Sequence, residues 1–413
     1  MNIIKFITAG SVDDGKSTLI GRLLYDTNSI LDDQLEAIQK ANRKNDDGTV
    51  DLAILTDGLK AEREQGITID VAYKYFQTEK RKFIIADAPG HIQYTRNMVT
   101  GASNSDLIII LIDARKGVIE QTKRHSFLAK LLGLKKVLVC VNKMDMMDYE
   151  LAVYENIKTD YLKLAKKLEL QDVDFIPVSA LKGDNIVHKS NRIEWYNGPS
   201  LLDYLENVEI KETENQGWRF PVQWVVRPQV SDLHDYRGYA GRVLGEGLKV
   251  GEEVLVLPNG NKTTIKAIEL NQTNLNEAQN GASVIIHLND DVDISRGDCI
   301  VSANHPAQIE RNFEANISWF ENKALDTNQV YLLQTHSNLT KIKIQEILYK
   351  YDVHTQEQLK NESINLNDIG RVTIKAANDV VYDSQQNFPE NSRAIIIDPR
   401  TNITVAAAII QGP

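Results

Sequence analysis

One eight-residue segment constrains the fold of this chain more than any other. Residues 10–17 read Gly-Ser-Val-Asp-Asp-Gly-Lys-Ser, which fits the pattern G-x-x-x-x-G-K-[ST], and they follow the apolar run 3–9. A buried strand that turns through this pattern into a helix is typical of the loop that cradles the phosphates of a nucleoside triphosphate. The sequence Thr-Leu-Ile-Gly-Arg-Leu-Leu at 18–24 supplies that helix. The segment therefore predicts an α/β domain with a phosphate-binding loop.

The residue types of this loop suit the chemistry of phosphates. Glycines let backbone N–H groups curl around an anion, and the helix that follows directs its positive end to the same point. The Lys16 ammonium can reach the β- and γ-phosphates, and the Ser17 hydroxyl can bind Mg²⁺. The residues expected to surround the phosphates are Gly10, Ser11, Val12, Asp13, Asp14, Gly15, Lys16, Ser17 and Thr18. An unrelated surface turn could carry the same letters, so the motif needs support from elsewhere in the chain.

A second motif predicts which base is bound. Asn142-Lys143-Met144-Asp145 follows the strand-like run 136–141. The Asp145 carboxylate can accept two hydrogen bonds from the N1–H and the exocyclic amine of guanine, a donor pair that adenine lacks, so it would specify GTP. We expect Asn142 to brace the loop and Lys143 to lay its stem along the base. Ser179, Ala180 and Leu181 follow another strand-like run, 175–178, and would offer a backbone N–H to the guanine oxygen.

Two segments between these motifs are expected to sense the third phosphate. The apolar run 83–86 leads into Asp87-Ala88-Pro89-Gly90-His91, which places Asp87 to bind Mg²⁺ through water and the Gly90 N–H to meet the γ-phosphate. Upstream, Thr68 would be the second hydroxyl ligand of Mg²⁺. His91 is the candidate for orienting the attacking water, and the alternative is a structural histidine of the same segment.

Composition limits the other classes of function. Two cysteines, Cys140 and Cys299, each lie in an apolar strand-like run and are expected to be buried thiols of a reduced, cytoplasmic protein. No run approaches the roughly 18 apolar residues that a membrane-spanning helix needs, so no membrane partner is expected. The balance of Lys plus Arg against Asp plus Glu is 28 to 31 in residues 1–210 and 19 to 26 in 211–413, so no basic surface for nucleic acid is indicated.

The pattern of apolar residues divides the chain into three predicted domains. Residues 1–210 alternate strand-like and helix-like segments, which is typical of a parallel sheet flanked by helices. Residues 217–305 and 306–413 are rich in short β-branched runs between turns, which indicates two all-β barrels. The charged run 211–216 is the expected linker, although a plain surface loop would look the same. The expected barrel strands are 220–226, 238–244, 253–257, 263–270 and 282–288, then 314–319, 329–333, 341–350, 371–376, 393–397 and 403–410.

Several smaller features complete these expectations. Residues 26–66 form a long polar excursion with helical periodicity at 34–42 and 52–64, expected as an extended first switch segment. An amphipathic helix is expected at 151–168 and a short one at 200–206. The three tryptophans of the barrel strands, Trp218, Trp224 and Trp319, are expected in the barrel cores.

The motifs together resemble a known superfamily. A GTPase domain with D-x-P-G-H, N-K-M-D and a G-I-T-I switch before two β-barrels is similar to the translational GTPases, of which elongation factor Tu is the familiar member. The particular residues within these motifs more closely resemble those of the large, GTP-hydrolysing subunit of the heterodimeric bacterial sulfate adenylyltransferase. This likeness rests on residues 10–17, 62–73, 89–98, 102–106 and 220–224. Elongation factors carry histidines where this chain has Ser11 and Asp14. Asp13 matches an aspartate that lies near a monovalent cation in some relatives.

The resemblance implies a reaction shared between two chains. In that family a small subunit of the ATP-pyrophosphatase type transfers the adenylyl group of ATP to sulfate, giving adenylyl sulfate and pyrophosphate. The large subunit hydrolyses GTP to drive this nucleotidyltransferase step of sulfate assimilation. The present chain shows one P-loop and neither an S-G-G-x-D-S loop nor an H-x-G-H pair, so it lacks a visible adenylyl-transfer site.

Two other functions remain open at this point. The chain could be a translation factor that carries aminoacyl-tRNA on its barrels, against which the acidic charge balance argues only mildly. It could also be a regulatory GTP switch whose barrels bind an effector and whose hydrolysis only resets the switch.

Overall fold

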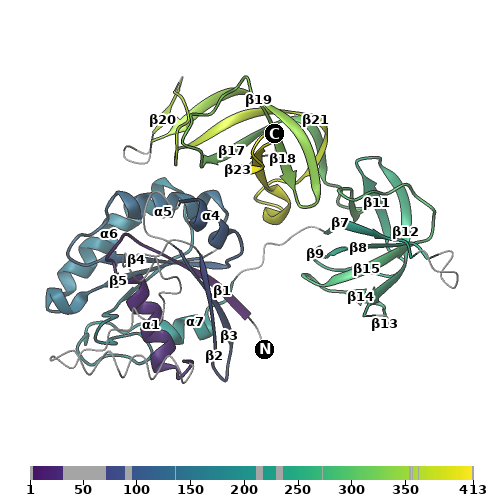
Figure 1. The fold of residues 1–413 in the computed structure, drawn as a ribbon. Coiled ribbons are helices and arrows are strands. Elements are labelled where there is room, and N and C mark those ends of the chain that lie inside the picture. Colours follow the sequence, from purple (N-terminus) through teal and green to yellow (C-terminus); the bar gives the residue numbers. More distant parts are fainter. Residues whose placement is uncertain are drawn as a thin grey trace. The chain divides into compact units, whose positions relative to one another are not determined.

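The computed structural model describes residues 3–30, 71–88, 95–134, 136–210, 217–228, 236–271, 273–352, 355, 357–360 and 362–411 (Figure 1). The chain divides into two compact units, residues 1–211 with 353–356, and residues 212–352 with 357–413. The predicted helices at 34–42 and 52–64 and the expected linker 211–216 lie outside the described residues.

The first unit is an α/β domain built on one sheet. Its strand order is β2, β3, β1, β4, β5, β6. The bounds of these strands are β1 Ile3–Ala9, β2 Ala72–Gln77, β3 Lys82–Asp87, β4 Leu107–Asp113, β5 Lys136–Asn142 and β6 Val173–Pro177. All neighbouring pairs are parallel except β2 with β3. The expectation of a parallel sheet is therefore confirmed with one antiparallel edge strand, because the Thr78–Arg81 turn is too short for a parallel crossover.

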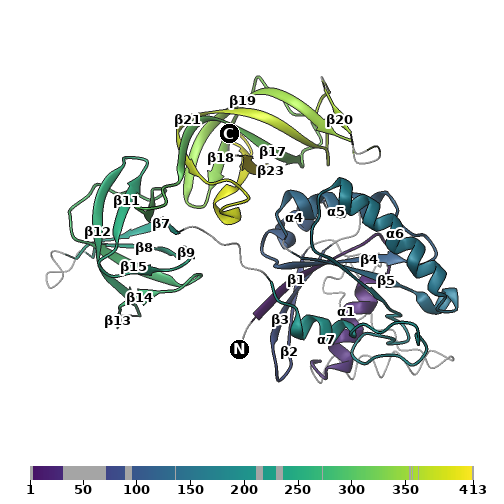
Figure 2. The same ribbon diagram turned by 180° about the vertical axis from the view of Figure 1, so that it is seen from behind.

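Helices cover both faces of this sheet. Figure 1 shows α1 and α7 on one face and α4, α5 and α6 on the other, and Figure 2 shows the same layers from behind. Within the described residues of this domain, the helices are α1 Lys16–Asp26, α4 Thr95–Ser103, α5 Glu120–Leu131, α6 Leu151–Lys167 and α7 Leu201–Asn207, with a 3₁₀ turn, η3, at Met144–Met147. Strand β4 is buried along its whole length, as expected for a strand between two helical layers.

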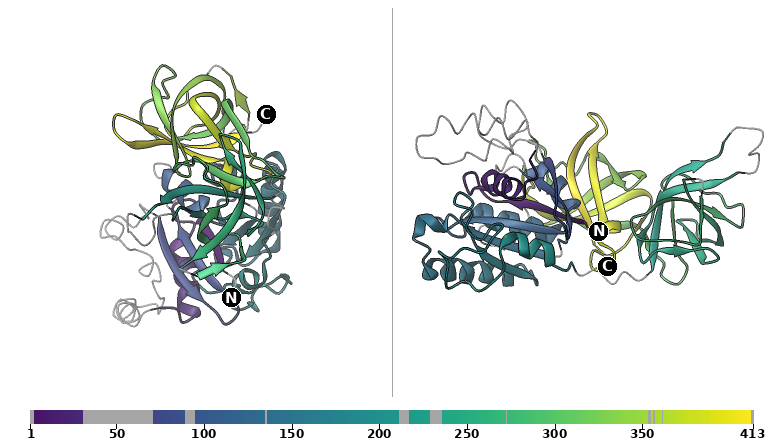
Figure 3. Two further views of the ribbon diagram at one scale, coloured as in Figure 1. Left: turned by 90° about the vertical axis from the view of Figure 1, so that its right-hand side faces the viewer. Right: turned by 90° about the horizontal axis from the view of Figure 1, so that it is seen from below.

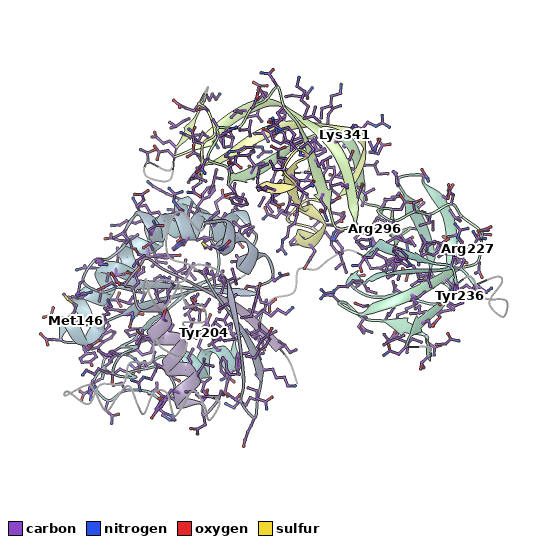
Figure 4. All side chains as sticks on the ribbon, viewed as in Figure 1. Met146, Tyr204, Arg227, Tyr236, Arg296 and Lys341 are labelled. Atoms are coloured by element: carbon purple, nitrogen blue, oxygen red, sulfur yellow. The ribbon has the colours of Figure 1, made fainter. Side chains whose placement is uncertain are left out.

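The two helices expected at 151–168 and 200–206 are confirmed, with small differences at their ends. The second begins after Ser200, whose Oγ accepts the Asp203 N–H at 3.2 Å and so satisfies a free amide of the first turn. Tyr204 of this helix, labelled in Figure 4, donates its hydroxyl to Asp174 Oδ2 at 2.7 Å and ties α7 to β6.

The second unit contains two closed β-barrels, which are seen from two further directions in Figure 3. The strands of the first ring, in spatial order, are β7 Trp218–Val226, β8 Gly238–Arg242, β15 Ser283–Leu288, β12 Asn261–Leu270, β11 Glu253–Leu257 and β16 Cys299–Ser302. Short pieces beside it are β9 Leu244–Gly245, β10 Leu248–Lys249, β13 Thr273–Leu275 and β14 Glu277–Ala278. Pairing of β16 with β7 and of β11 with β12 closes the ring and leaves it without an open edge.

The second ring follows the same principle with longer strands. In spatial order these are β18 Val330–Thr335, β22 Arg393–Asp398, β23 Ile403–Gln411, β17 Gln308–Trp319, β21 Ile369–Tyr382 and β19 Asn338–Tyr351. Pairing of β18 with β19 closes the ring, β20 Gln358–Leu359 extends β19, and the 3₁₀ turn η5 spans Pro389–Ser392. The α/β domain and the two barrels confirm the fold class expected from sequence.

One tryptophan prediction is wrong. Trp218 and Trp319 are each 1% exposed, as expected of core residues, but Trp224 is 62% exposed. A register shift in the pairing of β7 with β8 falls between Val222 and Trp224 and reverses which side chains face inward. Val225 packs against the barrel core in place of Trp224.

Candidate nucleotide-binding site

The phosphate-binding loop lies between the end of β1 at Ala9 and the start of α1 at Lys16. Its curvature depends on residues with left-handed backbone, Asp13 with φ of 67° and Gly15 with φ of 92°. Only glycine fits the second position, because a Cβ there would lie 2.4 Å from the side-chain nitrogen of Asn142. The first turn of α1, with its unpaired amides and positive dipole end, opens directly after this glycine.

Lys16 is the buried cation of the loop. Its side chain is almost enclosed, and its Nζ donates to the carbonyl oxygens of Gly10 at 2.9 Å and Ser11 at 3.0 Å. Burial lowers its pKa, while the nearby carboxylates of Asp87 and Asp14 act in the opposite direction. These two carbonyl contacts hold the ammonium group inside the curve of the loop, where an anion would meet it.

Asp87 lies at the end of β3, beside the loop. Its carboxylate is 1% exposed and its Oδ1 accepts the Thr8 hydroxyl at 3.3 Å, since Thr8 and Asp87 are register partners. Ser17 is the second residue of α1. A carboxylate and hydroxyl oxygens form the hard donor set that suits Mg²⁺. The described residues hold no cluster of three or more His, Cys, Asp or Glu side chains, so phosphate and water oxygens would have to complete such a site.

Asn142, at the end of β5, connects three segments of the site. The side chain is 1% exposed, its Nδ2 donates to the carbonyl oxygen of Asp14 at 2.8 Å, and its Oδ1 accepts the Ala180 N–H at 2.9 Å. The bracing role expected of Asn142 therefore has a physical basis in the fold. Of the three amides expected to serve the guanine oxygen, those of Ser179 and Ala180 are bonded within the protein, whereas the described residues offer no acceptor to Leu181 N–H.

Lys143 takes the left-handed conformation, with φ of 63°, and its side chain runs back across the phosphate-binding loop. Its Nζ donates to the carbonyl oxygen of Asp13 and lies 3.1 Å from Asp113 Oδ2. The stem of Lys143 is thereby fixed at both ends. Asp145, in η3, is half-buried, and no described group donates a hydrogen bond to its carboxylate, as a base-reading acceptor requires.

Asp113 is a site residue that the sequence reasoning missed. It ends β4 and pairs in register with Asn142 of β5. Its 1% exposed carboxylate accepts the Arg115 Nε–H at 2.9 Å and an Arg115 terminal N–H at 2.6 Å, besides its contact with Lys143. These donors hold the pKa of Asp113 well below its usual range despite burial. An acidic residue at the end of a fully apolar strand was the available signal.

Two further residues beside the site carried no sequence signal. Arg22 of α1 donates to the carbonyl oxygens of Ala180 at 3.3 Å and Leu181 at 2.7 Å, which joins the helix to the segment 179–181. His125 of α5 is 4% exposed, and its Nδ1 has no hydrogen-bond partner among the described residues. Burial, with the positive charge of Lys16, lowers the pKa of His125 to about 3, so the imidazole is neutral.

The structure thus brings together the expected phosphate loop, Asp87, Asn142, Lys143 and the segment 179–181 at the carboxyl ends of the strands. Thr68, Gly90 and His91 lie outside the described residues. The two cysteines, Cys140 and Cys299, are free and buried as expected, and burial raises the pKa of both thiols. No helix within the described ranges is long and apolar enough to cross a membrane.

Comparison with known proteins identifies the family. The elongation factor Tu GTP binding domain matches residues 1–211, and the GTP-eEF1A C-terminal domain-like family matches residues 312–411. Sulfate adenylyltransferase subunit 1 of Cellvibrio japonicus is 49% identical over 413 residues, which is 99% of this chain and 86% of the relative. The chain belongs to the sulfate adenylyltransferase subunit 1 family.

Other relatives of the subunit 1 family agree. The protein of the same description from Bacteroides fragilis is 45% identical over 412 residues, covering 99% of this chain and 86% of its own length. Among solved structures, the GTP-bound GTPase-like domain of Saccharomyces cerevisiae Ski7 has a TM-score of 0.52 at 18% identity, covering 100% of this chain and 98% of that domain. The likeness to the Ski7 domain supports the fold alone.

Proposed function

We propose that this chain is the GTP-hydrolysing subunit of a sulfate adenylyltransferase. GTP hydrolysis here drives the formation of adenylyl sulfate and pyrophosphate from ATP and sulfate on a small partner subunit of the ATP-pyrophosphatase type. The observation that carries the proposal is the near full-length identity to sulfate adenylyltransferase subunit 1, over a chain that contains a GTP-binding domain. The translation-factor and plain-switch alternatives are not favoured, because the same relatives span all three predicted domains.

Each residue of the nucleotide site has a role in this proposal. Asp145 reads the guanine, the Lys143 stem lies along the ring, and the Leu181 N–H faces the guanine oxygen. Asn142 holds the phosphate-binding loop and the segment 179–181 at fixed positions through its 2.8 Å hydrogen bond to Asp14 and its 2.9 Å hydrogen bond from Ala180. The interior curve of the phosphate loop then meets the triphosphate at a fixed distance from the base.

Hydrolysis is assigned to the residues near the γ-phosphate. Lys16 neutralises charge on the β- and γ-phosphates, the Gly90 N–H meets the γ-phosphate and His91 orients the attacking water. Ser17, Thr68 and Asp87 would hold Mg²⁺, which when bound offsets negative charge on the phosphate oxygens. The buried free thiols of Cys140 and Cys299 suit a cytoplasmic site of action.

The coupling between GTP hydrolysis and adenylyl sulfate formation is the decisive property to test. The chain should be co-expressed with a candidate small subunit, and GTP hydrolysed and adenylyl sulfate formed should be measured in one reaction. We expect hydrolysis to be slow in the isolated chain and to rise when small subunit, ATP and sulfate are all present. Thr68→Ala should leave the heterodimer assembled but break the link between the two rates. Hydrolysis indifferent to ATP and sulfate, with no effect of GTP on adenylyl sulfate yield, would favour the plain switch.

A further inference from the structure

A buried carboxylate without a cationic partner lies inside the phosphate-binding loop. Asp14 is 2% exposed, its Oδ2 accepts the Ser11 N–H at 2.6 Å, and its Oδ1 is shielded from solvent with no hydrogen-bond partner among the described residues. Buried carboxylates are normally paired or fully hydrogen-bonded, because desolvating a charge is costly. This one stands in the part of the fold that receives an anion.

The cation nearest to Asp14 in the chain is engaged elsewhere. Lys16 directs its Nζ to the carbonyl oxygens of Gly10 and Ser11, and no described cation lies within ion-pair distance of the Asp14 carboxylate. Lys16 and Lys116 act on it only at longer range, and the carboxylate of Asp113 opposes them. Burial raises the pKa of Asp14, which reflects the same shortage of stabilising partners.

A hydrogen bond from the Ser11 N–H holds the Asp14 carboxylate to the loop, and the backbone on either side is also fixed. The backbone carbonyl of Asp14 is held by Asn142 Nδ2 at 2.8 Å, and the next residue, Gly15, is fixed in the left-handed region. The Oδ2 of Asp14 lies beside Gly10, because a Cβ added at Gly10 would be 3.4 Å from this oxygen. The Asp14 carboxylate therefore lies against a backbone amide of the phosphate-binding loop, and a carboxylate and a phosphate brought together in a poorly solvated site repel each other.

We propose that Asp14 sets the lifetime of the bound nucleotide: its carboxylate repels the phosphates and speeds their release, without touching the base or the transferred group. The inference rests on the guanine-nucleotide binding proposed above. In this role Asp14 tunes affinity as part of the loop, while Asp145 sets specificity. Faster release of GDP would free the site sooner for the next GTP in a chain that hydrolyses GTP repeatedly.

The test is the dissociation rate of a fluorescent GDP, N-methylanthraniloyl-GDP, from the full chain after mixing with excess GDP. Asp14→Asn retains an oxygen to accept the Ser11 N–H but removes the charge, so we expect dissociation to slow by about tenfold or more. Asp14→Ser is a second neutral variant with a hydroxyl acceptor, and it carries the test if the Asp14→Asn variant folds poorly. Asp160→Asn, which removes an exposed charge on α6, should leave the rate unchanged.

The outcomes separate this inference from the proposed function. If the neutral variants release the GDP at the wild-type rate or faster, the carboxylate does not repel the nucleotide and the inference is wrong, although GTP binding stands. If the wild-type chain fails to bind the fluorescent GDP at all, the guanine-nucleotide assignment itself is wrong.

Discussion

Arg219 and Asp383, 164 positions apart, form a bidentate ion pair inside the second unit. Arg219 Nε donates to Asp383 Oδ2 at 2.8 Å, a terminal guanidinium nitrogen donates to Oδ1 at 2.7 Å, and the side chains are 4% and 9% exposed. Arg219 belongs to β7 of the first barrel, and Asp383 follows β21 of the second. Asn391 Nδ2 donates to the same carboxylate at 2.7 Å, so the pair is embedded in a buried polar network that joins the two barrels.

Breaking this pair should strongly destabilise the second unit. Arg219→Ala would leave Asp383 buried without its cation, which typically costs about 3–5 kcal/mol of unfolding free energy. The exposed pair Arg311 with Asp379, also of bidentate geometry, is the control, and Arg311→Ala should change stability little. Urea unfolding of both variants measures the difference, and equal losses would show that burial of Arg219 contributes nothing.

Asp145→Asn should change the base preference. The carboxamide can no longer accept two hydrogen bonds from guanine, but it can donate to the extra oxygen of xanthine. We expect GTP affinity to fall by about 10²-fold or more and xanthosine triphosphate to bind measurably. Competition titrations with the two nucleotides measure this. Retained affinity and preference for GTP would mean that Asp145 does not read the base.

Asp113→Asn should weaken nucleotide binding indirectly, through its effect on Lys143. The amide cannot anchor the Lys143 ammonium as the carboxylate does, and a hydrogen bond between charged groups contributes about 1.5–3 kcal/mol, or roughly 10- to 150-fold in affinity. Lys143→Met and the double variant complete a cycle of GDP affinities. Because the two residues are 3.1 Å apart, their effects should not add, and strictly additive losses would contradict the positioning role of Asp113.

His125 should contribute to acid sensitivity. Its pKa in the folded chain, about 3, lies below that of an unfolded histidine, about 6.5, so the unfolded chain takes up this proton first as pH falls. The stability it provides is complete above about pH 6.5 and is lost as pH falls toward 3, with about 2 kcal/mol lost at pH 5.

His125→Gln removes this titration while keeping a polar side chain of similar size. Comparing unfolding free energies at pH 7.5 and pH 5 for both proteins isolates the contribution, since the other titrating groups are common to the two. The same pH dependence in variant and wild type would show that His125 does not titrate as its burial requires.

Lys16 and His91 should separate binding from hydrolysis. Lys16→Ala removes the buried positive charge of the phosphate loop and should abolish tight GTP binding. His91→Ala should still bind GTP but hydrolyse it about 10²-fold or more slowly, the range for losing a positioned catalytic group. Binding is measured by fluorescent-nucleotide titration and hydrolysis by single turnover, and unimpaired turnover of His91→Ala would make this histidine structural.

The sequence was sufficient to predict those elements that are determined by residues close to one another in the chain. The strand, the phosphate loop and the helix at residues 3–26 follow from an apolar run, from glycines and from the phosphate-binding pattern. The succession of alternating segments and then β-branched runs predicted an α/β domain before two barrels. Ser200 could be placed near a helix start because capping needs only residues within one turn.

Tertiary structure decided the features that depend on residues far apart in the chain. The antiparallel β2 and the outward Trp224 follow from a short turn and a register shift, neither of which the apolar pattern contains. The Asp113 contact with Lys143, the Asn142 bond to Ala180 and the Arg219 pair with Asp383 join residues 30, 38 and 164 positions apart. Sequence determined which chemical groups the chain carries and on which elements they lie. Only the packing of those elements decided which groups meet, because burial and charge pairing act through space and not along the chain.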